Sequence, residues 1–304
     1  MTGAVLPSNC DCVIPVERIN IQNNIATLEG GIGLTQWQNI HLQGSDHAKG
    51  FALAHCGQTL NAPEIAVAAA AGYGQVKVAK LAKVAIIATG DELVSPDVEI
   101  KAWQIRRSNT TAIASSLKAL GYEASEYHLK DDLESLRNKL KELLKSNDML
   151  ILTGGVSMGK FDFVPQVLQE LDVKQIFHKV TQRPGKPLWF GTCPEKSVFG
   201  LPGNPVSALI NFQRYILPQL LTSQGIPNKA LLQIELSEDF SFGKNMTRFL
   251  PVTICSIGSK LSASPQRTNG SGDFGALSGS QGFIELEAEV CEFKAGYVAP
   301  FYPW

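Results

Sequence analysis

Short, continuously apolar runs alternate with segments of helical periodicity between residues 83 and 225. Each apolar run is bounded by glycine or a polar turn, which is typical of strands buried on both faces. The periodic segments place leucine, isoleucine and valine at intervals of three and four, and polar capping residues precede them. The alternation predicts strands at 84–88, 122–130, 148–153 and 197–200, and helices at 108–121, 131–146, 163–171 and 205–221, the last bent or broken near Pro218. Strands that alternate with helices indicate an α/β fold, a parallel sheet covered on both faces.

The flanking regions have a different texture. The first 50 residues are rich in Gly, Asn and Gln, with β-like runs at 10–19 and 38–44. An Ala-rich helix is expected to end at Gly72 and to be followed by a strand, and short β runs between turn residues fill the chain after the Gly225–Lys229 hinge. We therefore divide the chain into a partial N-terminal β domain (1–50), a linker helix and strand (51–82), the α/β domain (83–225) and a small, barrel-like C-terminal β domain (229–304).

Composition excludes several classes of protein. The 27 Lys and Arg residues balance 28 Asp and Glu residues, so no excess of positive charge favours nucleic acid or an anionic membrane. The sequence contains no apolar run of the roughly 20 residues that span a bilayer, and its start does not resemble a secretory signal. The six cysteines are scattered without metal-binding spacing, which favours reduced thiols and a cytoplasmic protein.

The stretch "LTGGVSMGKFD", Leu152–Asp162, places three glycines and a serine where a buried strand meets a helix. Ligands of parallel sheets bind at the carboxyl ends of strands, and a helix N-terminus favours anions. Gly154 and Gly155 would let the backbone approach a phosphate, and Ser157 could donate a hydrogen bond. The stretch matches neither a Walker A motif nor G-x-G-x-x-G, so ATPase and NAD functions lose support. A tight turn without a ligand is the alternative.

Three other loops are expected at the same edge. Asp91 and Glu92 follow one strand as possible cation ligands, and Gly203-Asn204 follow another. Arg183 and Lys186 could attract a phosphate or an oxyanion. Backbone donors, cations and carboxylates together suit a phosphorylated ligand with a divalent metal. The loop residues that we assign to ligand binding are Thr89, Gly90, Asp91, Gly154, Gly155, Val156, Ser157, Gly159, Pro202, Gly203, Asn204 and Pro205. Taken singly, Asp91, Asp131, Asp132 and Asp162 could instead be helix caps.

The motifs "TGDEL", "TGGVSMGKFDF", "RPGKPLWFG" and "GLPGNPVSA", in this order and spacing, resemble the MoeA/gephyrin family of molybdopterin molybdenumtransferases. The resemblance extends to "MTGAVLPSNCDCVI", "NAPEIAVAAAAG" and "NGSGDFGALSGSQGFIELE", and so covers nearly the whole chain. It implies a Mog-like molybdopterin-binding α/β domain, a C-terminal β domain and a homodimer. The implied reaction inserts molybdate into adenylylated molybdopterin and releases AMP, with Mg²⁺ assisting.

The resemblance also implies roles for individual residues. Those that match acidic or basic positions of the family's active site are Glu92, Asp131, Asp132, Asp162, Lys179, Arg183 and Lys186, with Glu92 and Asp162 as the metal ligands. Pro202 and Pro205 match the "PGNP" turn, Thr2 the "TGA" motif and Ser271 the "GSG" motif. The chemistry is consistent, because attack on a phosphoanhydride needs a cation and carboxylates to hold it, and the molybdate dianion needs positive side chains.

Some positions differ from the family pattern. Arg183 stands where lysine is more common, Arg106-Arg107 replace a tyrosine and an acid, and "HLQGSD" replaces a basic run before "GED". The family usually carries a further region before "TGA", so the chain resembles an N-terminally truncated member. We expect it to bind adenylylated molybdopterin but to insert molybdenum slowly or not at all when alone. The alternatives are a non-catalytic binding or scaffold module and a Mog-type adenylyltransferase. A separate Mog-type adenylyltransferase is also a possible partner.

Overall fold

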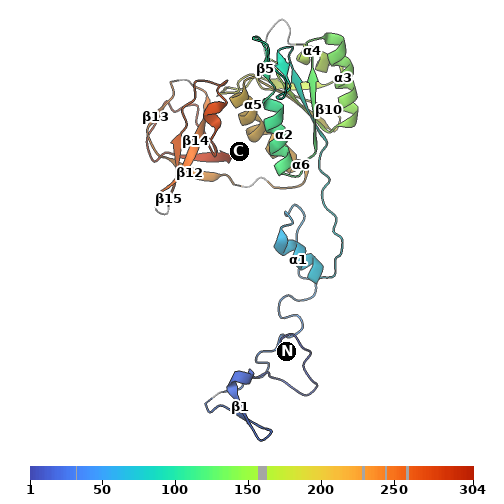
Figure 1. Ribbon diagram of the computed structural model, residues 1–304, viewed down its shortest axis with the longest axis vertical. Coiled ribbons are helices and arrows are strands. Elements are labelled where there is room, and N and C mark those ends of the chain that lie inside the picture. The colour runs from blue at the N-terminus through green and yellow to red at the C-terminus, as the bar shows by residue number, and fades with distance from the viewer. Residues whose placement is uncertain (32, 157–162, 228–229, 244, 258–259) are drawn as a thin grey trace. The chain divides into compact units, whose positions relative to one another are not determined.

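The computed structural model describes residues 1–31, 33–156, 163–227, 230–243, 245–257 and 260–304 (Figure 1). The chain divides into two compact units, Met1–Tyr73 and Gly74–Trp304. Within the described residues, the structure contains no helix that combines the length and the apolar character needed to cross a membrane.

The first unit contains little regular structure. A 3₁₀ turn, η1 (Val16–Arg18), leads into an antiparallel hairpin of β1 (Ile19–Gln22) and β2 (Ile25–Leu28). Asn23 and Asn24, both with positive φ, form its two-residue turn, as expected for asparagine in a tight hairpin. Helix α1 (Ala62–Ala70) begins at a capping box of Asn61 and Glu64 and is followed by Gly72 at φ 87°.

The predicted β runs at 10–19 and 38–44 and the strand after Gly72 were wrong apart from Ile19, the first residue of β1. Pro15 lacks a backbone N–H and interrupts the first run, and Asn39 adopts a positive φ that ends extended backbone in the second. The third run has exposed Val76 and Val78, and no strand of the described residues pairs with it, so its apolar residues do not form part of a sheet.

The α/β domain is built on a six-stranded sheet of order β6-β3-β7-β11-β10-β8. Its first four strands are parallel: β6 (Ala124–Leu129), β3 (Val84–Thr89), β7 (Met149–Thr153) and β11 (Lys196–Leu201). The sequence predicted this parallel arrangement correctly. Two strands that it did not predict, β10 (Trp189–Cys193) and β8 (Lys174–His178), extend the sheet in antiparallel fashion.

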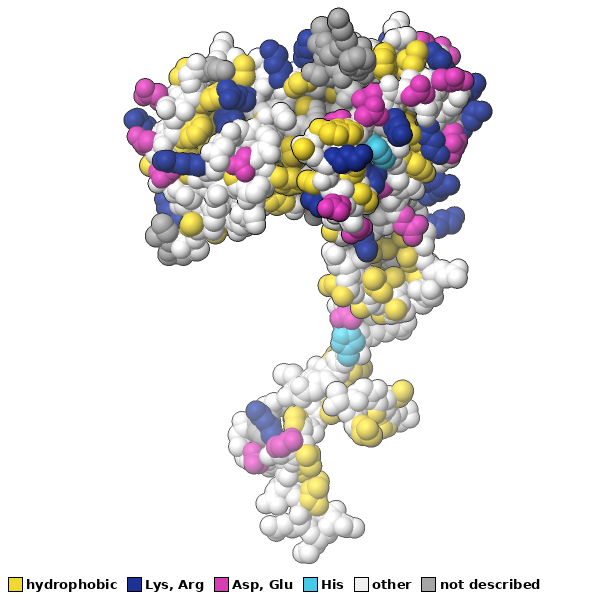
Figure 2. Space-filling model, turned by 45° about the horizontal axis from the view of Figure 1, so that its top comes forward, with side chains coloured by type: hydrophobic (Ala, Val, Ile, Leu, Met, Phe, Trp, Pro, Cys, Tyr) yellow, Lys and Arg dark blue, Asp and Glu magenta, His cyan; other side chains and the backbone are white. Residues whose placement is uncertain are grey.

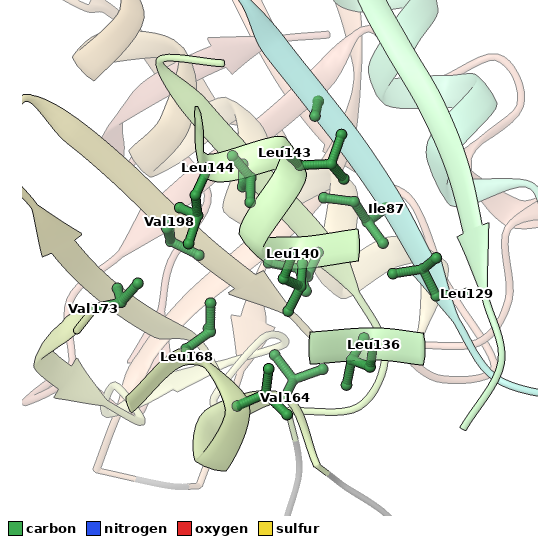
Figure 3. Close-up of a cluster of buried hydrophobic side chains, with 14 of the residues drawn as sticks. Ile87, Leu129, Leu136, Leu140, Leu143, Leu144, Val164, Leu168, Val173 and Val198 are labelled. Atoms are coloured by element: carbon green, nitrogen blue, oxygen red, sulfur yellow. The ribbon is translucent and has the colours of Figure 1, made fainter. Parts of the chain in front are cut away.

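Helices cover both faces of this sheet. α3 (Leu133–Ser146) and α4 (Val164–Glu170) pack on one face, and Figure 3 shows their leucine and valine side chains in one cluster with Ile87 of β3. The other face is covered by α2 (Asn109–Ala119), α5 (Pro205–Asn211), the π-helical segment η2 (Phe212–Ile216) and α6 (Leu217–Ser223). The residues of β3 are all buried and alternate between these two cores, which accounts for its continuous apolar run.

The C-terminal domain is a closed barrel. Five strands pair in the order β15-β12-β18-β16-β14, and β14 returns to pair with β15. They are β12 (Leu232–Leu236), β14 (Thr247–Ile257), β15 (Lys260–Pro265), β16 (Gly282–Leu286) and β18 (Val298–Pro303). Three short elements accompany them: β13 (Phe240–Ser241), β17 (Glu292–Phe293) and the 3₁₀ turn η3 (Gly275–Leu277). The barrel-like fold expected here is confirmed, and closure leaves no free edge among the five strands.

The barrel and the α/β domain are joined by strand pairing and by a polar contact. β9 (Gln182–Arg183), which follows β8 in the chain, pairs in parallel with β14 of the barrel. Arg214 of η2 donates from Nε to Glu285 of β16 at 2.8 Å, and the Tyr302 hydroxyl donates to the same carboxylate at 2.6 Å. A further short parallel pair, β4 (Leu93–Val94) with β5 (Ile105–Arg106), lies between β3 and α2 in the chain.

Positive and negative side chains are interspersed on the face of the molecule shown in Figure 2, in keeping with the formal net charge of −1. Arg137 of α3 and Glu170 of α4 form one such pair at 2.6 Å, with both side chains more than a third exposed. Hydrogen bonds from Gln166 and from Arg137 hold the pKa of Glu170 below its usual value.

We expect Arg137→Met to change the free energy of unfolding by less than about 1 kcal/mol, because exposed ion pairs gain little beyond the entropy of ordering two long side chains. Chemical denaturation of the wild type and the variant measures the difference. A loss of several kcal/mol would show that this pair joins α3 to α4 more strongly than its exposure indicates.

Candidate functional site

Two cavities adjoin each other at the carboxyl ends of β3, β7 and β11, and the turn Pro202–Pro205 borders both. The first, which we call the strand-end pocket, has a volume of about 660 Å³, and its wall includes Thr89, Glu92, Arg107, Asn109, Gly154, Gly155 and Asn204. The second, the arginine pocket, has a volume of about 640 Å³, and its wall includes Arg183, Lys186, Asn204, Arg248 and Ser271. Three residues, Pro187, Pro202 and Asn204, line both.

The strand-end pocket has side-chain atoms that lack hydrogen-bond partners. Thr89 is only 4% exposed, yet its Oγ1 has no partner among the described residues. The same holds for Nε of Arg107 and Oδ1 of Asn109, although Asn109 donates from Nδ2 to the Gly203 carbonyl at 2.8 Å. Buried polar atoms are almost always hydrogen-bonded. Three unpartnered atoms around one cavity therefore indicate a polar ligand that supplies the missing partners.

The glycines of this pocket are required by packing. Gly154 has φ 91°, and a Cβ there would lie 2.7 Å from the Thr89 carbonyl oxygen. Gly155 has φ 62°, and its Cβ would lie 2.8 Å from Thr89 Oγ1. From the sequence we expected these glycines to let the backbone approach a ligand. The structure adds a different reason for them, because they bring the loop after β7 onto the end of β3.

The two arginines of the arginine pocket come from different domains. Parallel pairing of β9 with β14 makes Arg183 and Arg248 register partners. Both guanidinium groups lie over the ring of Phe242, at 5.9 Å and 5.3 Å from its centroid. Within the described parts of the chain, no carboxylate forms an ion pair with either. An uncompensated cation pair of this kind favours an anionic ligand.

Arg248 is the more buried of the two arginines, and its Nε lacks a partner among the described residues. Burial, and to a smaller extent the positive charge of Arg183, lower the pKa of Arg248 to about 10. The side chain therefore still carries its charge at neutral pH. Sequence analysis did not find Arg248, because a single arginine at the start of an apolar strand carries no local signal; only the pairing of β14 with β9 places it beside Arg183.

Ser271 connects the C-terminal domain to the turn between the pockets. Asn204 donates from Nδ2 to Ser271 Oγ at 2.8 Å, and the Val206 N–H donates to the Ser271 carbonyl at 3.1 Å. The loop that carries Ser271 is ordered by Asp273, whose carboxylate accepts hydrogen bonds from the backbone N–H groups of Asn269 and Ala276. These bonds stabilise the ionised carboxylate and so lower the pKa of Asp273.

Other predicted site residues lie elsewhere. Asp132 accepts a hydrogen bond from the Ser135 N–H at 2.8 Å and is the N-cap of α3. Asp131 donates its backbone N–H to the Asp91 carboxylate at 3.4 Å. Lys179, at φ 73°, donates its N–H to the carbonyl of Leu188, the residue before β10. These side chains do not line either pocket.

The predicted metal ligands can be compared only in part. Glu92 lines the strand-end pocket, whereas Ser157, Gly159 and Asp162 lie outside the described residues. Within the part of the chain that the structure describes, no group of three or more His, Cys, Asp or Glu side chains could hold a metal ion. Glu92 is a carboxylate at the wall of the strand-end pocket, and Mg²⁺ commonly takes one or two carboxylates together with substrate phosphates.

Comparisons with known proteins give the family. Residues 1–72 match the MoeA N-terminal region (domain I and II), residues 85–222 a probable molybdopterin binding domain, and residues 233–304 the MoeA C-terminal region (domain IV). A protein from Synechocystis named molybdopterin molybdenumtransferase is 36% identical, over all of this chain and 76% of its own. One of the same name from Staphylococcus epidermidis is 32% identical, over 98% of this chain and 71% of its own.

Among solved structures, a molybdopterin biosynthesis MoeA protein from Pyrococcus horikoshii superposes with a TM-score of 0.82 at 30% identity. The match covers 99% of this chain and 74% of that one. Sequence and structure therefore agree over the α/β domain, the barrel and the N-terminal unit alike, and the chain belongs to the MoeA family.

Proposed function

We propose that this chain is a molybdopterin molybdenumtransferase of molybdenum cofactor biosynthesis, which inserts molybdate into adenylylated molybdopterin and releases AMP. Family membership supports the general role, since the relatives carry that name. The observation that carries the proposal is the adjacency of the two cavities. One offers unpartnered polar atoms to a nucleotide and pterin, the other offers a cation pair to an oxyanion, and a single turn borders both.

The strand-end pocket would hold adenylylated molybdopterin. Its volume of about 660 Å³ lies in the range of ordinary small-molecule sites. Thr89 and Asn109 would supply hydrogen bonds to the ligand, and Arg107 would pair with a phosphate. Glu92 would hold Mg²⁺ together with the ligand's phosphates, and a bound Mg²⁺ supplies charge neutralisation at the phosphoanhydride.

The arginine pocket would hold molybdate. Arg183, Arg248 and Lys186 would bring three positive charges to a dianion, and charge-assisted hydrogen bonds of this kind are the strong ones. Asn204 and Ser271 lie between the two ligands and would orient both. When the oxyanion is bound next to the pterin, their bimolecular reaction becomes effectively unimolecular, which lowers the entropic part of the barrier.

Two other functions remain as alternatives. A binding or scaffold module would use the strand-end pocket without turnover. A Mog-type adenylyltransferase would need only the α/β domain, whereas here the arginine pocket takes Arg248 and Ser271 from the barrel and its adjoining loop. This contribution of the second domain favours the molybdenumtransferase. A homodimer and an adenylyltransferase partner also belong to the proposal; exposed Ile65 and Val67 on α1, a helix without buried residues, support contact with another chain.

A reconstituted assay tests the proposed reaction. The purified chain is mixed with adenylylated molybdopterin, Mg²⁺ and molybdate, and AMP release and molybdenum cofactor are measured together. We expect AMP release that depends on molybdate. Ligand binding without AMP release would favour the binding module. In a parallel mixture of the chain with molybdopterin, ATP and Mg²⁺, adenylylation of molybdopterin would favour the adenylyltransferase. Light scattering of the same sample measures the oligomeric state.

A further inference from the structure

Two cations, Arg183 at the end of β9 and Lys186 in the loop between β9 and β10, lie close together in the chain. Arg183 and Lys186 are both exposed, and they flank the buried Pro184 and Gly185. Arg183 must also stay beside Arg248, whose like charge repels it. Electrostatics alone would drive this loop away from the barrel when no anion is bound. The loop therefore needs an anchor that does not depend on the ligand.

A buried amide network supplies the anchor. Gln182 is 1% exposed and Asn211 is fully buried. Gln182 donates from Nε2 to Asn211 Oδ1 at 2.7 Å and to the Pro184 carbonyl at 3.1 Å. Asn211 donates from Nδ2 to the Gly185 carbonyl at 3.1 Å. These bonds hold the backbone on both sides of the loop's turn, between its two cations.

The fit around Gly185 shows how closely the network packs on the loop. Gly185 has φ 91°, and a Cβ at this position would lie 2.7 Å from Asn211 Oδ1 and 2.8 Å from Gln182 Nε2. Real Cβ atoms essentially never make such contacts. A side chain here would displace the amides, so the conformation of the loop and the position of Asn211 depend on each other.

The π-helical segment η2 completes the network. Leu217 donates its N–H to the Phe212 carbonyl five residues earlier, which widens the helix at this point. Tyr215 of the widened turn donates its hydroxyl to Gln182 Oε1, so Gln182 is bound from both Asn211 and Tyr215. The adjacent Arg214 pairs with Glu285 of the barrel, the domain that carries Arg248. One helical segment thus contacts both sides of the arginine pocket.

We propose that Gln182, Asn211 and Tyr215 are positioning residues, which hold Arg183 and Lys186 in place for the oxyanion before it binds. The inference rests on the proposed function of the arginine pocket as the oxyanion site. Asn211 lines neither pocket and can act on the oxyanion only through the loop, whereas Gln182 also lines the arginine pocket. Loss of the Asn211 amide should therefore weaken oxyanion binding and leave the strand-end pocket intact. In the reaction, the KM for molybdate should rise and kcat should change little.

The test compares Asn211→Leu with Asn147→Leu as a matched control. Asn147 is also buried and also uses its side-chain amide, donating to the Leu143 carbonyl, but it caps α3 and lines neither pocket. Molybdate and AMP are titrated separately into each protein by calorimetry. We expect Asn211→Leu to weaken molybdate binding by about three- to tenfold, because two buried partners lose their hydrogen bonds. AMP affinity should stay within twofold, and Asn147→Leu should lower Tm without changing molybdate affinity.

Hydrogen exchange of the segment 182–188 separates this inference from the proposed function. Exchange in the ligand-free protein should be faster in Asn211→Leu than in Asn147→Leu, and Tyr215→Phe, which removes one hydroxyl, should give a smaller increase. If the wild type binds no tetrahedral oxyanion, the proposed function of this pocket is wrong, and exchange still tests the anchor. Unchanged exchange and unchanged molybdate affinity in Asn211→Leu would overturn the inference.

Discussion

Arg248→Met should abolish measurable oxyanion binding while the free energy of unfolding stays unchanged or rises. Arg248 is half-buried, its Nε lacks a partner among the described residues, and Arg183 lies beside it in the strand register. The folded protein therefore bears the cost of desolvating one cation and of holding it near another. Methionine keeps much of the apolar stem and removes both costs, and replacing buried ionic groups by apolar ones is often neutral or stabilising.

The loss of affinity should be large because the same side chain is the most desolvated cation of the arginine pocket. A hydrogen bond to a charged group contributes about 1.5–3 kcal/mol, and Arg248 can make more than one, so we expect affinity to fall by at least about 100-fold. Calorimetric titration with molybdate, and with sulfate as a second tetrahedral dianion, measures the fall. Differential scanning calorimetry on the same samples measures stability.

Arg137→Met serves as the control for this variant. It removes the same charge from the exposed pair with Glu170, and Arg137 lines neither pocket, so oxyanion binding should be unaffected. A matched fall in both variants would assign the effect to net charge. Retention of molybdate by Arg248→Met at wild-type affinity would mean that Arg183 and Lys186 suffice, and that Arg248 has another role.

The elements predicted well from the sequence are those whose signal is local. β3 and β7 are buried on both faces, so every residue before the final threonine of each is apolar, and α3 repeats leucine along one face from its Asp132 cap. The two missed strands lack such a signal. β8 is mostly exposed at the edge of the sheet, and β10 includes Gly191, where a Cβ would clash with the Trp189 ring. Neither the polar edge nor the glycine is typical of a strand.

The same distinction holds for the candidate site. The loops after the parallel strands could be placed at one edge because topology requires it, and Glu92, Gly154, Gly155 and Asn204 do line one pocket. Arg248 could not be found, since its neighbour Arg183 is distant in sequence and they meet only through the pairing of β9 with β14. The amide network of Gln182 and Asn211 was missed for the same reason. Long-range pairs carry no pattern in a single sequence.

Thr89→Val should stabilise the protein and weaken its nucleotide binding at once. Thr89 ends β3 at the strand-end pocket, is 4% exposed, and leaves Oγ1 without a partner among the described residues. An unsatisfied buried polar atom costs about 1–3 kcal/mol, and valine replaces the hydroxyl with a methyl group of similar shape. We therefore expect a gain of about 1 kcal/mol in unfolding free energy, or roughly 2–4 °C in Tm for a domain of this size.

The hydroxyl is unpaired because, in our proposal, its partner is the ligand. If it bonds a phosphate oxygen, its loss should weaken binding of adenylylated molybdopterin by about 10- to 100-fold, the value of a hydrogen bond to a charged group. Thr192→Val is the control: Thr192 is half-buried in β10 of the same sheet and lines neither pocket, so ligand affinity should not change.

A stabilised Thr89→Val variant that binds the ligand as tightly as the wild type would show that this threonine lines the pocket but does not bind the ligand. A destabilised variant would mean that Oγ1 makes a bond within the protein, and that the orphaned atom is not a mark of the ligand. A substitution that raises the unfolding free energy but weakens ligand binding identifies a side chain whose partner is the ligand. Removing a side chain that stabilises the fold would instead lower the unfolding free energy.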